Sequence, residues 1–423
     1  MDPKFDSEHF VYVDGALHCE GVDVGRLADE FGTPLYVYSR AAMAQRIEVL
    51  RAAFGPDAHV CFAVKSNSNL SVLRLFAELG TGFDLVSGGE LRRLRAAGVP
   101  VDRAVFAGVA KADWEIREGL QAGIMLFNLE SAHELPILER MGAEVGREVP
   151  VAVRLNVDVE TDTHEYISTG RYHNKFGLSL DVAAGVVEAI AQSPHVRLEG
   201  YHVHLGSLLR SADPYLQALD RVFEFMDGAV VRREQVKYYD CGGGFGISYG
   251  DGQGMLDVAE LGQAMVPRLK ERGLVPILEP GRFLVADAGI LVTEVLGNKN
   301  SGGNRFVLVD AAMNDLLRPA LYGAEHPIAP LVEPGSGDDP VPCDIVGPVC
   351  ESADFLAKRR ELCPVAGGDR LAVFAAGAYG FSMSSNYNSR RRPAEVLVSG
   401  DHAGLIRRRE DFADMWAQEV FDE

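Results

Sequence analysis

Short apolar runs rich in β-branched residues recur at nearly even intervals through the first two thirds of the chain and alternate with amphipathic stretches. The runs predict eight strands, at residues 59–64, 83–86, 104–107, 124–127, 151–155, 198–203, 236–239 and 275–278. Helical spacing of apolar positions is clearest over residues 70–79, 90–97 and 132–141. This alternation predicts a (β/α)8 barrel; a doubly wound open sheet is the alternative, although it usually has fewer strands.

The pattern changes after residue 282. Five further runs predict strands at residues 283–295, 306–309, 344–346, 371–375 and 394–398, with glycine and proline but no helices between them. Strand-like runs also lie near the N-terminus, at residues 10–13, 16–18 and 35–38. We therefore expect an α/β barrel over residues 36–282 and an all-β sandwich or barrel domain built from residues 1–35 and 283–423.

Polar or glycine residues follow nearly every predicted barrel strand. They include Lys65, Glu90, Asn128, His204, the segment Gly242–Gly246 and Glu279. Barrel active sites lie at the face where the strands end, so these residues are candidates for a single site. Any one glycine could simply terminate a strand, but eight such endings are difficult to explain as turns alone.

Lys65 is the most informative of these residues, because only eight of the 41 basic residues in the chain are lysines. It closes the apolar run Cys61–Val64, where burial would lower the pKa of its amine and make it a nucleophile. A lysine that reaches solvent at the end of a strand is the plainer alternative.

Charge and cysteine content narrow the class of protein. A formal net charge of −20 argues against nucleic acid or an anionic membrane as a partner. No apolar run approaches the roughly 20 residues of a membrane span, and the first residues lack the regions of a signal peptide. The six cysteines form no CxxC pair and no metal-ligand spacing, so we expect reduced thiols, a cytoplasmic location and no metal site.

The strand-end residues together suit pyridoxal 5'-phosphate. Lys65 could bind the cofactor through its amine, and the glycines of 242–246 could present backbone N–H groups to a phosphate. Gly281 and Arg282 offer a second anion site. His204 could stack on the ring, and Glu279 could face the ring nitrogen. A nucleotide phosphate would also fit a glycine-rich loop, but the Gly-Lys-Ser/Thr of a P-loop is missing.

Several longer motifs carry a family resemblance. They are Phe62-Ala-Val-Lys65-Ser-Asn, residues 83–90, residues 174–177, His204-Leu-Gly-Ser207, Gly242–Gly246 and Glu279-Pro-Gly-Arg282. These motifs resemble the fold-type III pyridoxal-phosphate decarboxylases, whose fold is an alanine-racemase-like barrel with a β domain. Residues 314–322, 347–354 and 377–380 are similar to the diaminopimelate decarboxylases within that family.

The resemblance implies roles for particular residues. The implied catalytic residues are Lys65, Cys350, His204 and Glu279. Cofactor contacts are implied for Lys65, Asp84, His204, Ser207, Gly243, Gly244, Glu279, Gly281, Arg282 and Tyr379. The family also implies a homodimer with shared active sites, in which Cys350 reaches in from the partner subunit as the acid. The polarity of residues 162–174 makes that segment the expected loop over the substrate.

The distal end of the substrate is expected to contact Arg282, Arg318, Tyr322, Glu351 and Tyr379. Diaminopimelate carries both an amine and a carboxylate at that end, so its site needs a cation as well as an acid. Arg318 supplies the cation and would serve no purpose toward ornithine. We therefore expect decarboxylation of meso-2,6-diaminopimelate to L-lysine, the last step of lysine biosynthesis. Alternatives are another basic amino acid (ornithine, arginine or carboxynorspermidine) or a non-catalytic cofactor-binding regulator.

Overall fold

The computed structural model describes residues 7–160, 175–228, 236–250, 252–335 and 337–421. The chain divides into two compact units, one of residues 1–45, 248–253 and 284–423 and the other of residues 46–247 and 254–283. The expected closing loop at residues 162–174 lies outside the described residues. Each unit is described by itself.

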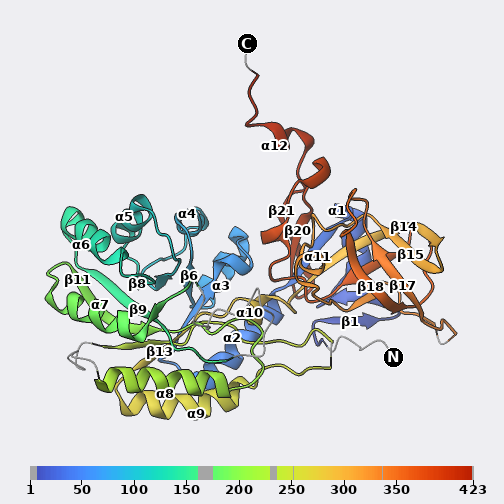
Figure 1. Cartoon of the computed structure of the whole chain (residues 1–423). Coiled ribbons are helices and arrows are strands. Elements are labelled where there is room, and N and C mark those ends of the chain that lie inside the picture. Colours follow the sequence, from blue (N-terminus) through green and yellow to red (C-terminus); the bar gives the residue numbers. More distant parts are fainter. Residues whose placement is uncertain (1–6, 161–174, 229–235, 251, 336, 422–423) are drawn as a thin grey trace. The chain divides into compact units, whose positions relative to one another are not determined.

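The second unit is a closed barrel of eight parallel strands (Figure 1). The strands are β5 (His59–Ala63), β6 (Gly82–Leu85), β7 (Ala104–Phe106), β8 (Leu126–Leu129), β9 (Val149–Asn156), β11 (Val196–His202), β12 (Tyr238–Asp240) and β13 (Val275–Leu278). Each strand pairs with the next, and β13 pairs in parallel with β5, which closes the ring. The short β10 (Leu178–Ser179) adds to β9. The predicted (β/α)8 barrel is confirmed.

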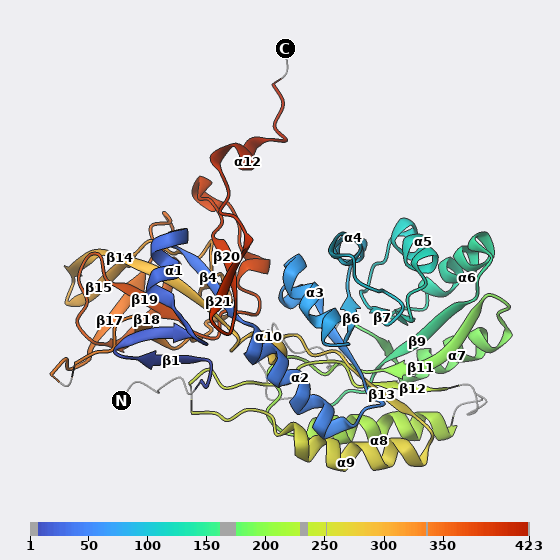
Figure 2. The same cartoon turned by 180° about the vertical axis from the view of Figure 1, so that it is seen from behind.

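Helices follow the strands and pack beside one another outside the ring (Figures 1 and 2). They are α2 (Arg40–Phe54), α3 (Leu70–Glu78), α4 (Gly88–Ala97), α5 (Asp113–Ala122), α6 (Glu134–Val145), α7 (Leu180–Gln192), α8 (Asp213–Gly228), α9 (Val258–Glu271) and α10 (Arg282–Val285). Buried side chains fill the barrel interior, which is a packed core rather than a pore; among them are Cys61, Val105, Leu126, Ala152 and Ile277.

The other unit is built around a nine-stranded sheet. Its strands are β4 (Leu35–Ser39), β14 (Gly289–Ser301), β15 (Asn304–Val309), β16 (Ile328–Pro330), β17 (Val341–Val346), β18 (Phe355–Leu362), β19 (Arg370–Val373), β20 (Ala394–Ser399) and β21 (His402–Arg407). A small sheet of β1 (Phe10–Val13), β2 (Ala16–Cys19) and β3 (Val22–Asp23) precedes α1 (Val24–Phe31). The chain ends after α12 (Phe412–Trp416).

Strand β4 shows why the N-terminal segment belongs to this unit. It lies between β14, with which it pairs antiparallel, and β20, with which it pairs in parallel. Its five residues are all buried, and Val37 packs with Ile290 and Val396 in one apolar cluster. Removing β4 would expose this cluster and split the sheet, so the expected participation of the N-terminal strands in the β domain is confirmed.

Two local predictions for the chain after residue 281 are wrong. The predicted strand 283–295 begins as the short helix α10 and becomes strand β14 only at Gly289. A helix also occurs where none was expected, because α11 (Arg318–Tyr322) lies between β15 and β16. Pro319 is tolerated in the first turn of α11, and Gly323 ends the helix at a φ of 61°. No described helix is long and apolar enough to cross a membrane.

Asp315, just before α11, is buried, and its carboxylate accepts hydrogen bonds from the Ala312 backbone N–H at 2.9 Å and from Asn314 Nδ2 at 3.0 Å. Burial raises the pKa of Asp315 from 3.8 to about 7, against the lowering effect of the Ala312 N–H. The folded state therefore keeps a proton that the unfolded state releases, so this group's contribution to stability falls as pH rises from about 4 to about 7.

We predict that Asp315→Asn becomes more stable relative to the natural protein as pH rises from 5 to 8. Asparagine stays neutral, whereas ionising the buried aspartate costs about 1.4 kcal/mol for each unit by which its pKa is raised. Melting temperatures of both proteins across this range measure the effect, and the exposed Asp401→Asn serves as the matched control. A difference between the two proteins that stays constant with pH would contradict the prediction.

Candidate active site

A cavity of about 480 Å³ opens at the carboxyl ends of the barrel strands. Its lining residues are Lys65, Val86, Ala107, Gly108, Val109, Ala110, Glu130, Arg154, Phe176, His202, His204 and Glu279. The volume is within the usual range for a small-molecule site. Strand ends that lie far apart in the sequence therefore meet at one place, as the strand-end residues predicted.

Lys65 points into this cavity, whereas a second lysine nearby does not. The Lys65 side chain is 36% exposed, so it is not buried as expected, and its Nζ lies 2.8 Å from Asp84 Oδ2. The Lys111 side chain is 1% exposed, and its Nζ donates to Gly108 O, Asn128 O and Glu134 Oε2 at 2.7, 2.8 and 3.1 Å. The three acceptors of Lys111 give it a structural role and leave Lys65 as the lysine that a ligand can reach.

Lys65 sits on a single turn of 3-10 helix, η1 (Val64–Ser66), immediately after β5. Gly281 packs against this turn so closely that a Cβ atom there would lie 3.0 Å from the Cβ atoms of Ala63 and Ser66. A side chain at position 281 would therefore push the turn that carries Lys65. Gly281 and Lys65, which are both predicted site residues, therefore lie on neighbouring segments of backbone.

Asp84, from β6, is fully buried. Burial and the charge of Glu279 raise the pKa of its carboxyl to about 6, although the ammonium of Lys65 opposes this shift. Asp84 is therefore ionised at neutral pH and holds the Lys65 amine in place. Its second oxygen, Oδ1, has no hydrogen-bond partner among the described residues, which is typical of a group completed by a ligand or a water molecule.

Glu279, at the end of β13, is one of the two acids that line the cavity, the other being Glu130. Asn128 Nδ2 donates to its Oε1 at 3.2 Å, and His202 Nε2 lies 3.3 Å from its Oε2. Burial alone would raise the pKa of Glu279, but His202 and the positive charge of Lys65 hold it below its usual range. The carboxylate is therefore ionised at neutral pH, as a partner for a protonated ring nitrogen must be.

His204 is fixed in orientation by the glycine-rich segment. The Gly243 backbone N–H donates to His204 Nδ1 at 3.1 Å, so a neutral ring carries its proton on Nε2. Burial and the positive charges of Arg154 and Lys65 lower the pKa of His204 well below its usual value. A neutral imidazole with a fixed plane is suited to stacking against an aromatic ring.

The glycines after β12 pack too tightly to be replaced. A Cβ atom at Gly243 would lie 2.3 Å from Glu279 O, and one at Gly244 would lie 2.2 Å from Gly206 O. Gly244 also has a φ of 90°, which side chains rarely adopt. Beside this segment, Arg282 Nη2 donates to Ser207 Oγ at 3.1 Å. A guanidinium, a hydroxyl and close-packed backbone therefore occur in one barrel unit, as an anion such as a phosphate requires.

These residues fit the predicted pyridoxal 5'-phosphate. The cavity offers an amine, an ionised carboxylate, a neutral imidazole and a buried polar atom, His202 Nδ1, that has no hydrogen-bond partner among the described residues. His202, His204 and Glu279 also bring potential metal ligands within 4.8 Å of one another. His204 Nδ1 and Glu279 Oε1 already accept hydrogen bonds, which favours the organic cofactor, and the expectation of no metal stays a prediction.

An ion pair on the cavity wall was not predicted from the sequence. Arg154 Nη1 donates to both carboxylate oxygens of Glu130 at 2.8 Å, and its guanidinium lies 4.8 Å from the centre of the Phe176 ring. Glu130 also accepts the Gly108 backbone N–H at 2.9 Å. The sequence shows Arg154 as a charged residue inside an apolar strand. Because burying an unpaired charge is costly, such a residue indicates a buried ion pair.

The other predicted residues belong to the β-domain unit. Arg318, on α11, is buried, and its Nη1 lies 2.7 Å from His326 Nε2. His326 Nδ1 lies 2.8 Å from Phe374 O; because a carbonyl only accepts, Nδ1 carries the proton and Nε2 accepts from Arg318. The guanidinium also stacks 4.7 Å from the centre of the Tyr249 ring. These contacts fix the direction of Arg318.

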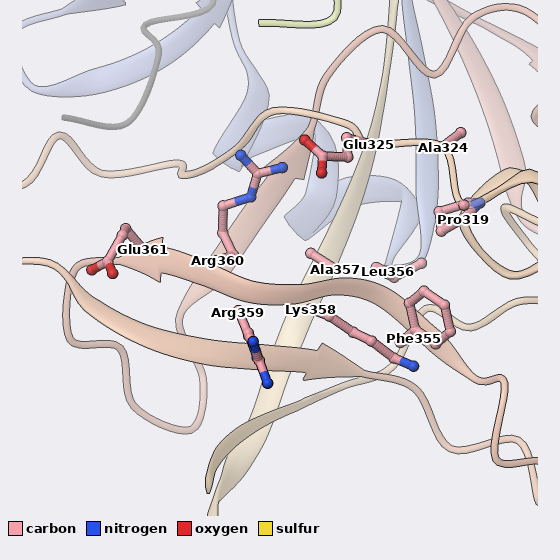
Figure 3. A pocket seen from close by; sticks show the side chains of 11 residues that line it. Pro319, Ala324, Glu325, Phe355, Leu356, Ala357, Lys358, Arg359, Arg360 and Glu361 are labelled. Atoms are coloured by element: carbon pink, nitrogen blue, oxygen red, sulfur yellow. The ribbon is translucent and has the colours of Figure 1, made fainter. Parts of the chain in front are cut away.

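Cys350 and Glu351 are exposed on the loop between β17 and β18, while Tyr322 and Tyr379 are partly buried. A second cavity of about 430 Å³ lies in this unit, between α11 and β18 (Figure 3). Its lining includes Pro319 from α11 and the charged residues Glu325, Lys358, Arg359, Arg360 and Glu361. The barrel cavity, where Lys65 pairs with Asp84 and Glu279 lies beside His202, is the candidate active site.

Comparisons with known proteins agree with this choice. A profile of the family described as "Pyridoxal-dependent decarboxylase, pyridoxal binding domain" matches residues 40–286. The chain is 46% identical to a diaminopimelate decarboxylase of Pseudomonas aeruginosa, covering 97% of this chain and 98% of that protein.

Solved structures give the same result. A diaminopimelate decarboxylase of Helicobacter pylori complexed with L-lysine matches with a TM-score of 0.89 and 37% identity, over 94% of this chain and 99% of that one. The enzyme of M. jannaschii in complex with L-lysine matches with a TM-score of 0.91 and 36% identity, over 98% of each chain. With the barrel cavity and its Lys65–Glu279 chemistry, these matches establish that the chain belongs to the diaminopimelate decarboxylase family of pyridoxal-dependent decarboxylases.

Proposed function

We propose that this protein uses pyridoxal 5'-phosphate to decarboxylate meso-2,6-diaminopimelate to L-lysine and CO2. The observation that carries the proposal is the barrel cavity itself, where the accessible amine of Lys65 and the ionised, buried carboxylate of Glu279 line the same space. Relatives that share nearly the whole chain bear the name of this activity.

When bound, the cofactor supplies an electron sink for the bond that releases CO2. Lys65 anchors it covalently, and Asp84 orients the Lys65 amine through their 2.8 Å ion pair. Glu279 keeps a proton on the ring nitrogen, since its carboxylate stays ionised beside His202. His204 covers one face of the ring, with its plane set by the Gly243 N–H.

The phosphate end is assigned to the glycine-rich segment and its neighbours. Gly243, Gly244 and Gly281 allow the backbone to approach closely, Arg282 supplies the cation, and Ser207 adds a hydroxyl already bound to Arg282. We assign Tyr379 to the same end, with a second contact to substrate.

Substrate selection rests on charge at the distal end of the amino acid. Arg318 and Tyr322 would bind the distal carboxylate, aided by Arg282, and Glu351 would bind the distal amine. An arginine is suited to a carboxylate because its guanidinium makes two parallel hydrogen bonds. Such remote contacts orient the reacting carboxylate without touching it. A substrate without a distal carboxylate, such as ornithine, leaves Arg318 unused.

Cys350 is assigned as the acid that ends the reaction. Its Sγ–H gives a proton to the carbon that has lost CO2, and the resulting thiolate recovers a proton from water. We propose a homodimer in which Cys350 is contributed across the interface, as the family resemblance implies. We place the enzyme in the cytoplasm, consistent with six cysteines that are all thiols rather than disulfides.

The substrate proposal predicts a clear order of rates. With holoenzyme, CO2 release from meso-diaminopimelate should exceed release from ornithine, arginine or carboxynorspermidine by at least about 100-fold in kcat/KM, because an unmatched buried charge costs roughly 3 kcal/mol. The lysine formed is identified by mass spectrometry. Faster turnover of ornithine than of diaminopimelate would reassign the substrate and leave the cofactor chemistry standing.

Lys65→Ala is predicted to abolish covalent attachment of the cofactor and to lower kcat by at least about 1,000-fold, since removal of the key nucleophile of a site has effects of that order. Borohydride treatment should fix pyridoxal phosphate to the natural protein and to Lys111→Ala, where Lys111→Ala stays folded, but not to Lys65→Ala. Retention of label on Lys65→Ala would contradict the assignment.

Glu279→Gln is predicted to lower kcat by about 100-fold or more, because an amide cannot keep the ring nitrogen protonated as an ionised carboxylate does. The absorbance spectrum of bound cofactor separates this loss from loss of binding. Glu130→Gln tests a second acid in the cavity, one paired with Arg154 rather than assigned to the ring, and should reduce kcat less. Equal losses in the two variants would argue against a specific role for Glu279.

A further inference from the structure

The buried carboxylate of Asp354 holds the loop that carries Cys350. Asp354 Oδ2 accepts the Val349 backbone N–H at 2.7 Å, and Asp354 Oδ1 accepts the Met313 backbone N–H at 2.7 Å. The loop is therefore fixed on the side of Val349 and Asp354. Cys350 itself is exposed, so packing does not determine where its thiol points.

A residue from another part of the β domain supplies the missing constraint. Asn388 Oδ1 accepts the backbone N–H of Cys350 at 2.7 Å. This hydrogen bond fixes the peptide plane between Val349 and Cys350. The plane fixes the position of the Cys350 Cα atom and so limits the region that Sγ can reach by rotation about the N–Cα and Cα–Cβ bonds.

Asn388 is presented by a backbone conformation that few residues adopt. It has a φ of 54° and ψ of 28°, and the next residue, Ser389, has a φ of 55°. Asparagine is enriched in this left-handed region, whereas most side chains are strained there. Such a conformation persists only where its surroundings hold it, and it is often associated with a functional site.

Neighbouring contacts hold this segment in place. Asn386 Nδ2 donates to Arg390 O at 3.0 Å and to Glu410 Oε2 at 2.6 Å, and Arg390 Nη2 donates to Asp310 O at 2.6 Å. The turn that carries Asn388 is thus fixed at both ends to β-domain residues outside the turn. Asn388 can therefore hold the backbone N–H of Cys350 in a fixed position.

We propose that Asn388 is a positioning residue for the acid Cys350, an inference that rests on the role assigned to Cys350 in the proposed function. Asn388 touches neither substrate nor cofactor; it holds the backbone from which the Cys350 side chain projects. Proton transfer is sensitive to such geometry, since misplacing a reacting group by about 1 Å can cost on the order of 100-fold in rate.

Two substitutions separate the hydrogen bond from the backbone conformation. Asn388→Gly tolerates the left-handed φ but removes the acceptor, and we expect kcat to fall about tenfold with KM for diaminopimelate changed less than about twofold. Asn388→Asp keeps an acceptor of the same size, and we expect it to restore kcat to within about threefold of the natural protein. Ser389→Gly, which relaxes the adjacent residue without touching the bond, should leave kcat unchanged.

The same Asn388→Gly change in a Cys350→Ala background tests the route of the effect. If Asn388 acts through Cys350, the double variant should be less than about twofold slower than Cys350→Ala alone, because the two changes remove one interaction. Cofactor absorbance and melting temperature should match between Asn388→Gly and Ser389→Gly, which excludes a general loss of structure.

The remaining outcomes would overturn either the positioning role of Asn388 or the assignment of Cys350 as the acid. Full activity of Asn388→Gly beside a slow Cys350→Ala overturns the positioning role and leaves the proposed function intact. Multiplicative losses in the double variant, or a failure of Asn388→Asp to recover activity, also overturn it. Full activity of Cys350→Ala removes Cys350 as the acid, and with it both the assignment in the proposed function and this inference.

Discussion

Closure of the parallel strand ring is the constraint on which the active site depends. Because β13 pairs with β5, the residues that follow these strands become neighbours although most of the barrel sequence separates them. Lys65 and Glu279 therefore line one cavity, and Gly281 packs against the turn that carries Lys65. A parallel ring also places all strand ends on one face, which explains why chemistry gathers there and not at the opposite end.

The cavity concentrates ionisable groups that burial would normally exclude. Glu279 stays charged beside His202, while burial and the charge of Glu279 raise the pKa of Asp240 well above its usual value. The pKa of Asp84, which lies beside Lys65, is raised to about 6. The barrel thus shifts the pKa values of neighbouring acids in opposite directions. Such shifts in pKa are typical of functional sites, here one with a fixed negative charge and a reactive amine.

The sequence predicted the regular parts of the fold well. All eight barrel strands lie within two residues of their predicted bounds at each end, as for 104–107 against Ala104–Phe106, because alternating apolar and polar segments report burial directly. Short elements were harder to predict. The short helices α10 and α11 were missed, since four or five residues carry too little periodicity to distinguish a helix from a strand.

The sequence by itself determined the barrel, the β domain and the chemical types at the strand ends, because periodicity, glycine position and rare lysines are properties of the linear chain. Only the tertiary structure decided that Lys65 faces the cavity while Lys111 is enclosed, that Arg154 pairs with Glu130, and that Asn388 reaches Cys350. These are contacts between segments distant in sequence. Their geometry depends on strand register, loop conformation and packing, which no local pattern encodes.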